Sequence, residues 1–393
     1  MGARVTESSG RQERAAAAPE PVVCMLLPGG LEHAGGIGRW AGYLLGAWKG
    51  ADRPKIEIVD TRGAGSKLDG VFAFPLALLE LLRFGLQGRL ALIHANLSTR
   101  GSTVRKCVVT YLATLFGVPV VIHLHGSNFD GFYRGLAPIF QRLVKGMFRR
   151  AASVLVLGEI WRRFLVDEVG VEPGKVSVLF NGVPRPTARR PERAPDAPCR
   201  IVMLGRLAAR KGVPELLAAL GSEALRGRPW HAVLAGDGEV EETRRRAAEL
   251  GLADRIDVPG WVSAARASAL LAEADILVLA SHAENMPMSV LEALAHGVAV
   301  VTTPVGTTPE ILENGVSALL VPPGDVPALE GALVTLIDRP MLRAEIAAAG
   351  HGVFSRQLDI ALAADRLTAL YRDCAPILRA ARSVTGEGDA QES

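Results

Sequence analysis

Short apolar segments of strand length alternate with helical stretches along most of the chain. In the first half these segments lie at 22–27, 55–60, 90–94, 118–124, 152–157 and 176–183. In the second half they lie at 199–204, 231–235, 255–261, 274–280 and 298–302. Segments that are apolar throughout and separated by helices are typical of parallel strands buried on both faces. Two successive series of this kind predict an α/β protein with two doubly wound parallel-sheet domains facing a cleft.

A proline-rich segment separates the two series. Residues 184–198 contain five prolines, which exclude regular secondary structure and indicate a linker. The expected order along the chain is a flexible tail at 1–20, an N-terminal domain at 21–184, the linker at 185–198, a C-terminal domain at 199–365, a helix at 366–382 that crosses back to the first domain, and a flexible tail at 383–393.

The composition is that of a globular protein and argues against several other classes. The chain has 393 residues, of which 49% are hydrophobic and 22% charged, enough for two domains with separate cores. A formal net charge of +3 is too small to indicate a nucleic-acid partner. The four cysteines lack the spacing of a metal or redox site, so we expect free thiols in a reducing cytosol. No uninterrupted apolar run reaches the ~20 residues that a membrane-spanning helix needs.

Two acids follow the apolar segment 274–280, at the place where a ligand would bind a sheet of this type. Glu284 comes just after the segment, and Glu292 lies about one turn into the next helix. Ligands of open α/β sheets bind at this carboxyl end of the strands. Two solvated surface acids are the simpler interpretation, but Glu292 lies between Leu291 and Ala293, where a surface helix does not require an acid.

The loop after the first strand of the second half is basic, and two of its cations are candidates for binding an anion. Arg206 and Lys211 lie on the segment from Gly205 to Gly212, between a strand and a helix. Both side chains can reach one anion there, with the N-terminus of the helix behind them. The alternative is a solvated basic turn.

The first half of the chain holds two further candidates. Gly35, Gly36 and Gly38 follow the first strand, a pattern that suits close approach of the backbone to a phosphate but also an ordinary tight turn. Their spacing is not that of a dinucleotide-binding fingerprint. His123 and His125 lie at the end of the strand at 118–124, where a histidine is more often packed than catalytic, and we interpret His123 as structural.

These segments together resemble the retaining glycosyltransferases of family 4, of the type that builds bacterial polysaccharides. Glu284 and Glu292 fall on the two acids of the Glu-x7-Glu motif of that family. Arg206 and Lys211 fall on its diphosphate clamp. The resemblance implies the GT-B fold, in which two Rossmann-like domains face a cleft.

The resemblance also implies roles for individual residues. His125 and Glu284 would be the catalytic residues that contact the transferred sugar. The residues expected to bind the donor are Gly36, Arg206, Lys211, Ser289 and Glu292. Because two fixed cations can stabilise the charge that develops on the departing diphosphate, we expect no metal ion and no cofactor apart from the donor substrate.

The implied activity is transfer of a hexose from a nucleotide diphosphate sugar, such as a UDP- or GDP-sugar, to an acceptor hydroxyl with retention at the anomeric carbon. Two alternatives on the same fold stay open. One is a nucleotide-sugar 2-epimerase or a phosphorylase, and the other is a non-catalytic subunit that binds a nucleotide sugar. The complete set of motif residues argues against the last of these.

A basic loop at 96–106 bears on the acceptor. It contains Arg100, Arg105 and Lys106 among several hydroxyl side chains and leads into a helix. It is either the solvated, capped start of that helix or a polar cradle for an anionic or sugar acceptor.

A basic amphipathic segment at 136–150 bears on the location of the protein. Arg142, Lys145 and Arg149 interleave there with a row of apolar residues, as in a core-facing helix or a helix that binds anionic lipids. Members of the resembled family that act on lipid-linked sugars dock through this part of the N-terminal domain. The resemblance therefore implies a cytoplasmic protein with peripheral contact to the inner membrane and a lipid-linked or surface polysaccharide acceptor.

Overall fold

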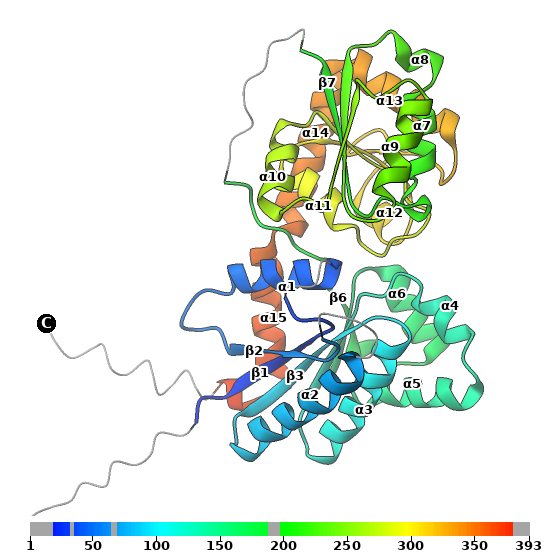
Figure 1. Ribbon diagram of the computed structural model, residues 1–393. Helices are drawn as coiled ribbons and strands as arrows, with labels where there is room; N and C mark the ends of the chain where they lie inside the picture. Colours follow the sequence, from blue (N-terminus) through cyan, green and yellow to red (C-terminus); the bar gives the residue numbers. More distant parts are fainter. Residues whose placement is uncertain (1–18, 32–34, 64–68, 188–196, 380–393) are drawn as a thin grey trace, which may run out of the picture.

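The computed structural model describes residues 19–31, 35–63, 69–187 and 197–379. These residues form two α/β domains, stacked one above the other in Figure 1, each built around a six-stranded sheet. Residues 1–18, 188–196 and 380–393, which include most of the expected tails and linker, lie outside the described residues. The expected fold class, two doubly wound sheets, is confirmed.

The N-terminal sheet is parallel, with strand order β2-β1-β3-β4-β5-β6. Its strands are β1 (Val22–Leu27), β2 (Lys55–Asp60), β3 (Leu90–Leu97), β4 (Val120–Leu124), β5 (Ser153–Val156) and β6 (Val176–Val178). Every residue of β1 is buried, as expected for a central strand covered on both faces. The strand order reverses beside β1, which marks the carboxyl end of this strand as a ligand-binding position.

The C-terminal sheet repeats this plan, with strand order β12-β11-β10-β7-β8-β9. Its strands are β7 (Cys199–Leu204), β8 (Trp230–Ala235), β9 (Ile256–Gly260), β10 (Ile276–Leu279), β11 (Ala299–Thr302) and β12 (Leu319–Leu320). Here the order reverses between β7 and β10, the two strands that precede the predicted cations and the predicted acids.

The helices cover both faces of each sheet. In the N-terminal half they are α1 (Gly36–Ala47), α2 (Asp69–Leu86), α3 (Gly101–Leu115), α4 (Phe129–Arg134), α5 (Pro138–Arg150) and α6 (Glu159–Arg163). In the C-terminal half they are α7 (Val213–Leu220), α8 (Glu223–Arg226), α9 (Val240–Glu249), α10 (Ala264–Glu273), α11 (Met288–Ala295), α12 (Thr308–Ile311), α13 (Val326–Asp338), α14 (Pro340–Val353) and α15 (Ile360–Cys374).

Alternate residues of β1 pack into two different cores. Val23 and Met25 belong to the core that contains the buried residues of α1 and α15. Val22 and Cys24 belong to the core that contains the buried residues of α2, α3 and α5. Because neighbouring side chains of a strand point to opposite faces, α1 and α15 cover one face of the N-terminal sheet, and α2, α3 and α5 cover the other.

The apolar segment at 176–183, which closes the first domain, enters the sheet only in its first part. The strand β6 ends at Val178, and the rest of this apolar segment contacts the C-terminal domain. The backbone N–H of Asn181 donates to Met286 Sδ at 3.1 Å, and Val183 forms an isolated parallel bridge with Asp359. The segment is apolar because it is buried between domains, and not only because it enters the sheet.

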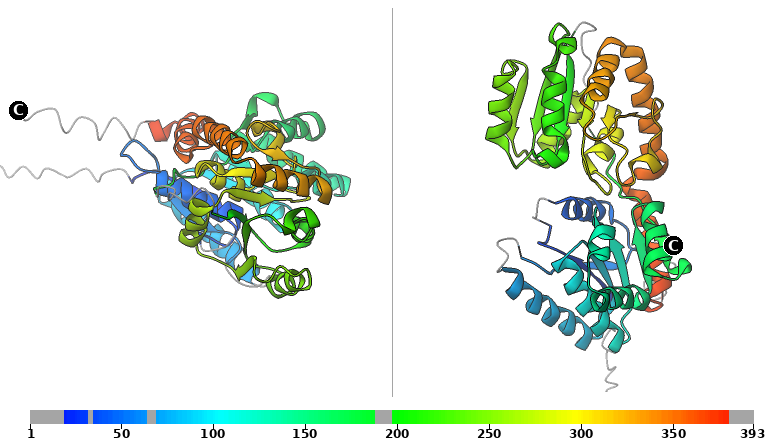
Figure 2. Two further views of the ribbon diagram at one scale, coloured as in Figure 1. Left: turned by 90° about the horizontal axis from the view of Figure 1, so that it is seen from above. Right: turned by 90° about the vertical axis from the view of Figure 1, so that its right-hand side faces the viewer.

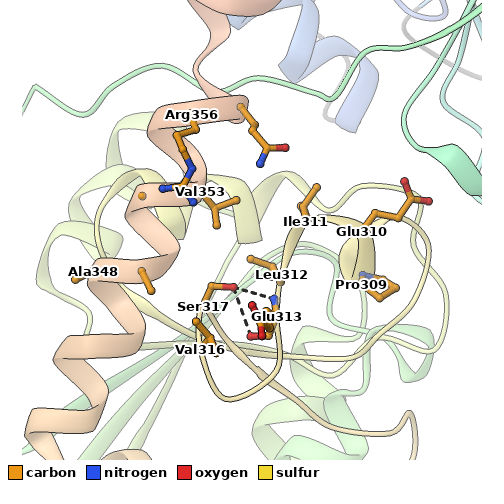
Figure 3. Close-up of a pocket in the computed structure, with 13 residues that line it drawn as sticks. Pro309, Glu310, Ile311, Leu312, Glu313, Val316, Ser317, Ala348, Val353 and Arg356 are labelled. Atoms are coloured by element: carbon orange, nitrogen blue, oxygen red, sulfur yellow. Dashed lines mark hydrogen bonds between the residues drawn. The ribbon is translucent and has the colours of Figure 1, made fainter.

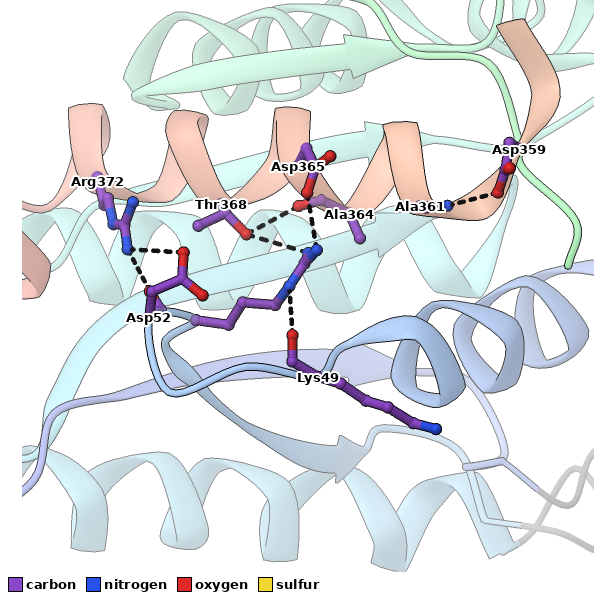
Figure 4. Close-up of polar contacts among 9 residues, drawn as sticks. Lys49, Asp52, Asp359, Ala361, Ala364, Asp365, Thr368 and Arg372 are labelled. Atoms are coloured by element: carbon purple, nitrogen blue, oxygen red, sulfur yellow. Dashed lines mark hydrogen bonds and ion pairs between the residues drawn. The ribbon is translucent and has the colours of Figure 1, made fainter. Parts of the chain in front are cut away.

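The last helix, α15, belongs to the N-terminal domain in space although it follows the C-terminal domain in sequence (Figures 1 and 2). Asp359 caps it by accepting from the Ala361 N–H at 3.0 Å, so the helix begins before residue 366. Figure 4 shows its polar contacts with the segment after α1. Arg53 pairs with Asp365 at 2.7 Å, and Arg372 donates to the Asp52 carbonyl.

Candidate active site between the domains

The carboxyl ends of the two sheets face each other across a cavity of about 230 Å³. Side chains from both domains line it, and three of the predicted site residues are among them: Gly36, His125 and Glu284. The cavity is also lined by Ile37, Ser98, Gly126, Ser127, Leu157, Asn181, Asn285, Met286 and Met288. Three of the predicted residues thus lie together at the carboxyl ends of the strands, where ligands of such sheets bind.

The N-termini of two helices from opposite domains meet at this cavity. Gly36 is the first residue of α1, and a Cβ added to it would lie 3.9 Å from Met288 Cγ, at the first residue of α11. Ser289 is the next residue of α11 and is buried. Both helices therefore present unpaired N–H groups and the positive ends of their dipoles to the same space, which favours an anion there.

His125 follows β4 and is held in one orientation by Asn96. The Asn96 amide nitrogen donates to the Leu26 carbonyl at 3.3 Å, which leaves its Oδ1, 2.9 Å away, to accept from His125 Nε2. Burial, with His94 nearby, lowers the pKa of His125 to about 3. The imidazole is thus neutral near pH 7, with Nε2 protonated and Nδ1 left as an acceptor, which suits contact with a sugar hydroxyl.

His123, expected to be structural, is buried within an aromatic cluster. The Trp40 ring lies edge-on to it, with centroids 4.9 Å apart, and the His94 ring is 5.4 Å away. Neither ring nitrogen of His123 has a hydrogen-bond partner, and burial holds its pKa well below the usual value. The Tyr371 hydroxyl of α15 is hydrogen-bonded to His94 Nδ1 at 2.8 Å, so the last helix completes this cluster.

Glu284 forms an ion pair with Lys211, and the pair is mostly buried. Ser281 Oγ donates to the same carboxylate oxygen, Oε1, at 2.9 Å. Lys211 ends a short 3-10 turn before Gly212, whose φ of 73° is in the left-handed region. A Cβ on Gly212 would overlap the carbonyl of Ala280, so only glycine lets the Lys211 turn approach the end of β10 this closely.

Arg206 is not joined to this ion pair. Its side chain is 67% exposed, and its guanidinium lies 3.6 Å from Asp237 on the loop after β8. Lys211 alone of the two predicted cations therefore contacts the predicted acids in the part of the chain that the structure describes.

Glu292 contacts the opposite domain. It is buried in the first turns of α11 and lies 3.1 Å from Arg39 Nε, while the Tyr43 hydroxyl donates to its Oε1 at 2.7 Å. Its Oε2 atom has no hydrogen-bond partner. Burial raises the pKa of Glu292, and Arg39 and Tyr43 act in the opposite direction.

Arg39 and Tyr43 of α1 and Thr307 were missed in the sequence. The first two are one helical turn apart on α1, a spacing visible in the sequence, but nothing there indicates that they face Glu292. Thr307 holds the acidic loop: its N–H and its hydroxyl both donate to the Asn285 carbonyl, each at 2.9 Å.

The predicted acceptor residues of the basic loop differ in environment. Lys106 is buried, donates to Thr61 Oγ1 at 3.0 Å, and has its pKa lowered to about 7 by burial. Burial also lowers the pKa of Arg105, whose Nε has no partner. Arg100, at the start of α3, is exposed and has a φ of 56°. On α5, Arg142 and Arg149 are exposed and Lys145 is half-buried.

A larger hollow in the C-terminal domain holds none of the predicted residues (Figure 3). It has a volume of about 580 Å³ and lies between the segment from Pro309 to Ser317 and the end of α14. Glu310 on its rim reaches the N-terminal domain instead, where its carboxylate accepts from the N–H groups of Glu159 and Ile160 at 2.6 and 2.9 Å. This contact caps α6 and ties the two domains together.

The described residues contain neither a candidate metal site nor a helix that could span a membrane. No group of three or more His, Cys, Asp or Glu side chains is placed to hold a metal ion. Within the same residues, no helix combines the length and the apolar character needed to cross a bilayer.

The comparisons with known proteins agree with this architecture. Residues 198–339 match the family model described as glycosyl transferases group 1, and residues 56–182 match the model described as a glycosyl transferase 4-like domain. Alpha-D-kanosaminyltransferase of Streptomyces kanamyceticus is 26% identical, over 72% of this chain and 77% of that protein. WcaL of Salmonella typhimurium, a glycosyltransferase whose name links it to colanic acid biosynthesis, is 30% identical over 55% of this chain, and the match spans 54% of its length.

Among solved structures, Alr3699/HepE of Anabaena, determined in complex with UDP, shares the fold. It aligns with a TM-score of 0.69 and 20% identity, over 90% of this chain and 100% of that chain. The family models and the named relatives show a glycosyltransferase, and its fold of two facing Rossmann-like domains is of the GT-B type. The chain belongs to the family-4 glycosyltransferases.

Proposed function

We propose that the protein transfers a hexose from a nucleotide diphosphate sugar to a saccharide hydroxyl, with retention at the anomeric carbon. The observation that carries this proposal is the cavity where the N-termini of α1 and α11 meet next to the Lys211–Glu284 pair. A diphosphate is the anion that such a site suits. The relatives support it, because HepE was determined with UDP and the kanosaminyltransferase is named for sugar transfer.

The geometry suggests how charge is handled during transfer. The bond from the anomeric carbon to the diphosphate oxygen breaks, and negative charge develops on the departing diphosphate. Lys211 and the N–H groups near Gly36 and Ser289 are fixed before the reaction, so they stabilise that charge without reorganisation. Arg206, exposed on the same loop, would join them by swinging into the cleft.

The two acids have separate tasks in this proposal. Glu284 accepts hydrogen bonds from hydroxyls of the transferred sugar, and neutral His125 contacts the same sugar from the other domain. Glu292 accepts from the ribose hydroxyls of the nucleotide. It is therefore not available as a second carboxylate for a double displacement of the kind that retaining glycosidases use.

The acceptor and the location belong to the same proposal. Arg100 and Arg105 of the basic loop would receive a polar or anionic acceptor, whereas Lys106 is buried against Thr61. The name of WcaL supports a polysaccharide intermediate, lipid-linked or at the surface. Arg142, Lys145 and Arg149 on α5 would contact anionic lipids at the cytoplasmic face of the inner membrane.

A donor screen tests the proposal. Purified protein is incubated with individual UDP- and GDP-sugars, with and without a membrane extract, and the released nucleoside diphosphate is measured. Acceptor-dependent release and a product whose anomeric proton shows the configuration of the donor would support it. Release without acceptor, or release that requires inorganic phosphate, would indicate an epimerase or a phosphorylase. Binding of donors without turnover under every condition would indicate a non-catalytic subunit.

A further inference from the structure

A long apolar groove lies between α2 and α3, on the face of the N-terminal sheet that α1 does not cover. Its volume is about 1290 Å³. Leu78 and Leu82 of α2 form one wall, Val109 and Leu112 of α3 form the other, and Ile93 of β3 lies at the bottom. Pockets for small ligands measure roughly 300–1,000 Å³, so the groove suits an extended chain better than a compact molecule.

The apolar surface continues from the groove onto the outer faces of both helices. Leu86 at the end of α2 is 81% exposed, and Leu115 at the end of α3 is 79% exposed. The exposed large apolar residues of these helices are Phe72, Leu76, Leu79, Leu82 and Leu86 on α2 and Val104, Val108, Leu112 and Leu115 on α3. Because they recur every three or four residues, they form one row on each helix. A continuous apolar face of this kind marks an interaction site.

The charges around this face are mostly positive. The described helices α3 and α5 contain no Asp or Glu, whereas α5 ends with Arg149 and Arg150. Arg150 lines the groove, and its guanidinium lies 4.4 Å from the centre of the Tyr111 ring. On α2, Asp69 and Glu80 are accompanied by Arg83, so this helix is an exception. Apolar rows beside arginines are complementary to a bilayer that carries anionic headgroups.

We propose that the groove between α2 and α3 takes a hydrocarbon chain from an anionic bilayer, while the apolar rows of both helices lie on the membrane. This inference rests on the membrane location proposed above and deepens it, because it names the element that enters the lipid. A second copy of the chain suits the face less well, because a two-fold pair would bring the arginines of one α5 towards those of the other.

Vesicle co-sedimentation of the full-length protein tests the surface. Wild type should pellet with phosphatidylcholine vesicles that contain phosphatidylglycerol, and less with phosphatidylcholine alone. Leu86→Glu and Leu112→Glu should each lower the partition coefficient at least about tenfold, because each places a charge where a leucine enters the hydrocarbon. Both side chains are exposed, so neither change should affect folding. The matched control is Met341→Glu on α14, which adds the same charge at a residue that is 76% exposed in the other domain.

Cys374 reports on the groove itself. Its half-buried thiol lines the groove, so the rate at which N-ethylmaleimide modifies Cys374, followed by peptide mass spectrometry, measures access. Anionic vesicles should slow this modification severalfold in wild type and not in Leu86→Glu. Modification at an unchanged rate while the protein is vesicle-bound would overturn the entry of a chain into the groove.

Two further outcomes separate this inference from its rivals. A dimer in light scattering that Leu86→Glu abolishes, with no vesicle binding, would overturn the inference in favour of a second copy. Equal loss of binding in Met341→Glu would overturn it in favour of nonspecific charge effects. Vesicle binding needs no turnover, so Lys211→Ala should still bind vesicles, and failure of the proposed transfer would leave this result unchanged.

Discussion

The two acids of the cleft are held in opposite ways. Glu284 is paired within its own domain, with Lys211 across neighbouring strand ends and with Ser281 on its own loop. Glu292 is paired across the domains, with Arg39 and Tyr43 of α1. The first arrangement survives any movement of one domain against the other, whereas the second does not. If Glu284 binds the sugar and Glu292 the ribose, as proposed above, the sugar half of the donor site is built in advance. The nucleotide half then forms when ribose hydroxyls replace the contacts of Glu292 with Arg39 and Tyr43.

Removal of Lys211 from the Lys211–Glu284 pair should have the largest effect on the transfer rate. Lys211→Ala removes the cation that would stabilise the departing diphosphate, and transfer should fall by about 10²–10³-fold, as when one fixed donor is removed from a charge-stabilising site. The measurement is kcat for nucleotide release at saturating donor, with unchanged circular dichroism. The control is Arg246→Ala on the exposed side of α9. Equal activity of the Lys211→Ala protein would remove Lys211 from the mechanism.

A substitution in the turn that carries Lys211 should have the next largest effect, in this case on the free energy of unfolding. Gly212→Ala requires a left-handed backbone at a residue with a Cβ, and it also overlaps the Ala280 carbonyl, so the unfolding free energy should fall by about 3 kcal/mol. Gly251→Ala is the matched control: its φ of 72° is similar, but nothing lies within 4 Å of the added Cβ. Strain alone should cost the control about 1 kcal/mol. Equal losses in urea unfolding would show that the close approach to β10 does not matter.

The histidine cluster makes the N-terminal side of the cleft sensitive to acid. Burial lowers the pKa of His94 and of His125 to about 3, and that of His123 is also well below its usual value. In the unfolded chain these groups bind protons below about pH 6.5. Their contribution to stability is therefore complete above that pH and is lost as the pH falls towards 3, at about 1.4 kcal/mol per pH unit for each histidine.

Replacement of one histidine tests this dependence. His123→Leu removes a ring whose nitrogens have no partners, so the pH dependence of the unfolding free energy between about pH 6 and pH 5 should become shallower by about 1.4 kcal/mol per unit. Phe148→Leu, which replaces a fully buried ring that does not titrate, should leave the slope as in wild type. An unchanged slope in His123→Leu would mean that His123 is not buried in its neutral form.

A change at the contact between Glu292 and α1 should have the smallest effect, and it should strengthen binding of the nucleotide. Tyr43→Phe deletes one hydrogen bond that competes with the ribose, so a nucleoside diphosphate should bind about two- to tenfold more tightly. Isothermal titration calorimetry measures this directly. Tyr111→Phe, which removes a hydroxyl that donates to the Leu143 carbonyl far from the cleft, is the control. Weaker binding in Tyr43→Phe would indicate that Tyr43 itself contacts the donor.

The strands could be predicted from the sequence wherever the apolar segment serves only the sheet. The segments at 22–27, 55–60 and 199–204 coincide with β1, β2 and β7, because polar or irregular residues flank them on both sides. The segment at 176–183 is different: only its first part enters the sheet, and its second part is buried by the other domain. An apolar segment predicts that its residues are buried, but it does not predict which part of the protein buries them.

Within the site, the positions of the residues along the strands could be predicted from the sequence, but their partners could not. Lys211 and Glu284 both follow strands that turn out to be neighbours, β7 and β10, and only the strand order makes them a pair. The partners of Glu292 lie on a helix of the other domain, so no local pattern could reveal them. Arg206 was expected beside Lys211 because of its spacing. Its exposed side chain instead lies next to Asp237.

The two places where the described chain passes between the domains lie side by side. Val183 accepts from the Ile360 N–H at 3.0 Å and donates to the Leu358 carbonyl at 2.9 Å. The segments at Val183 and Ile360 therefore form a hinge, about which one domain can rotate while few backbone contacts change. The two segments approach each other closely at Gly182, since a Cβ there would lie 2.6 Å from Ile360 Cα. A methyl group at this one position would overlap the backbone of Ile360 and push the two segments apart.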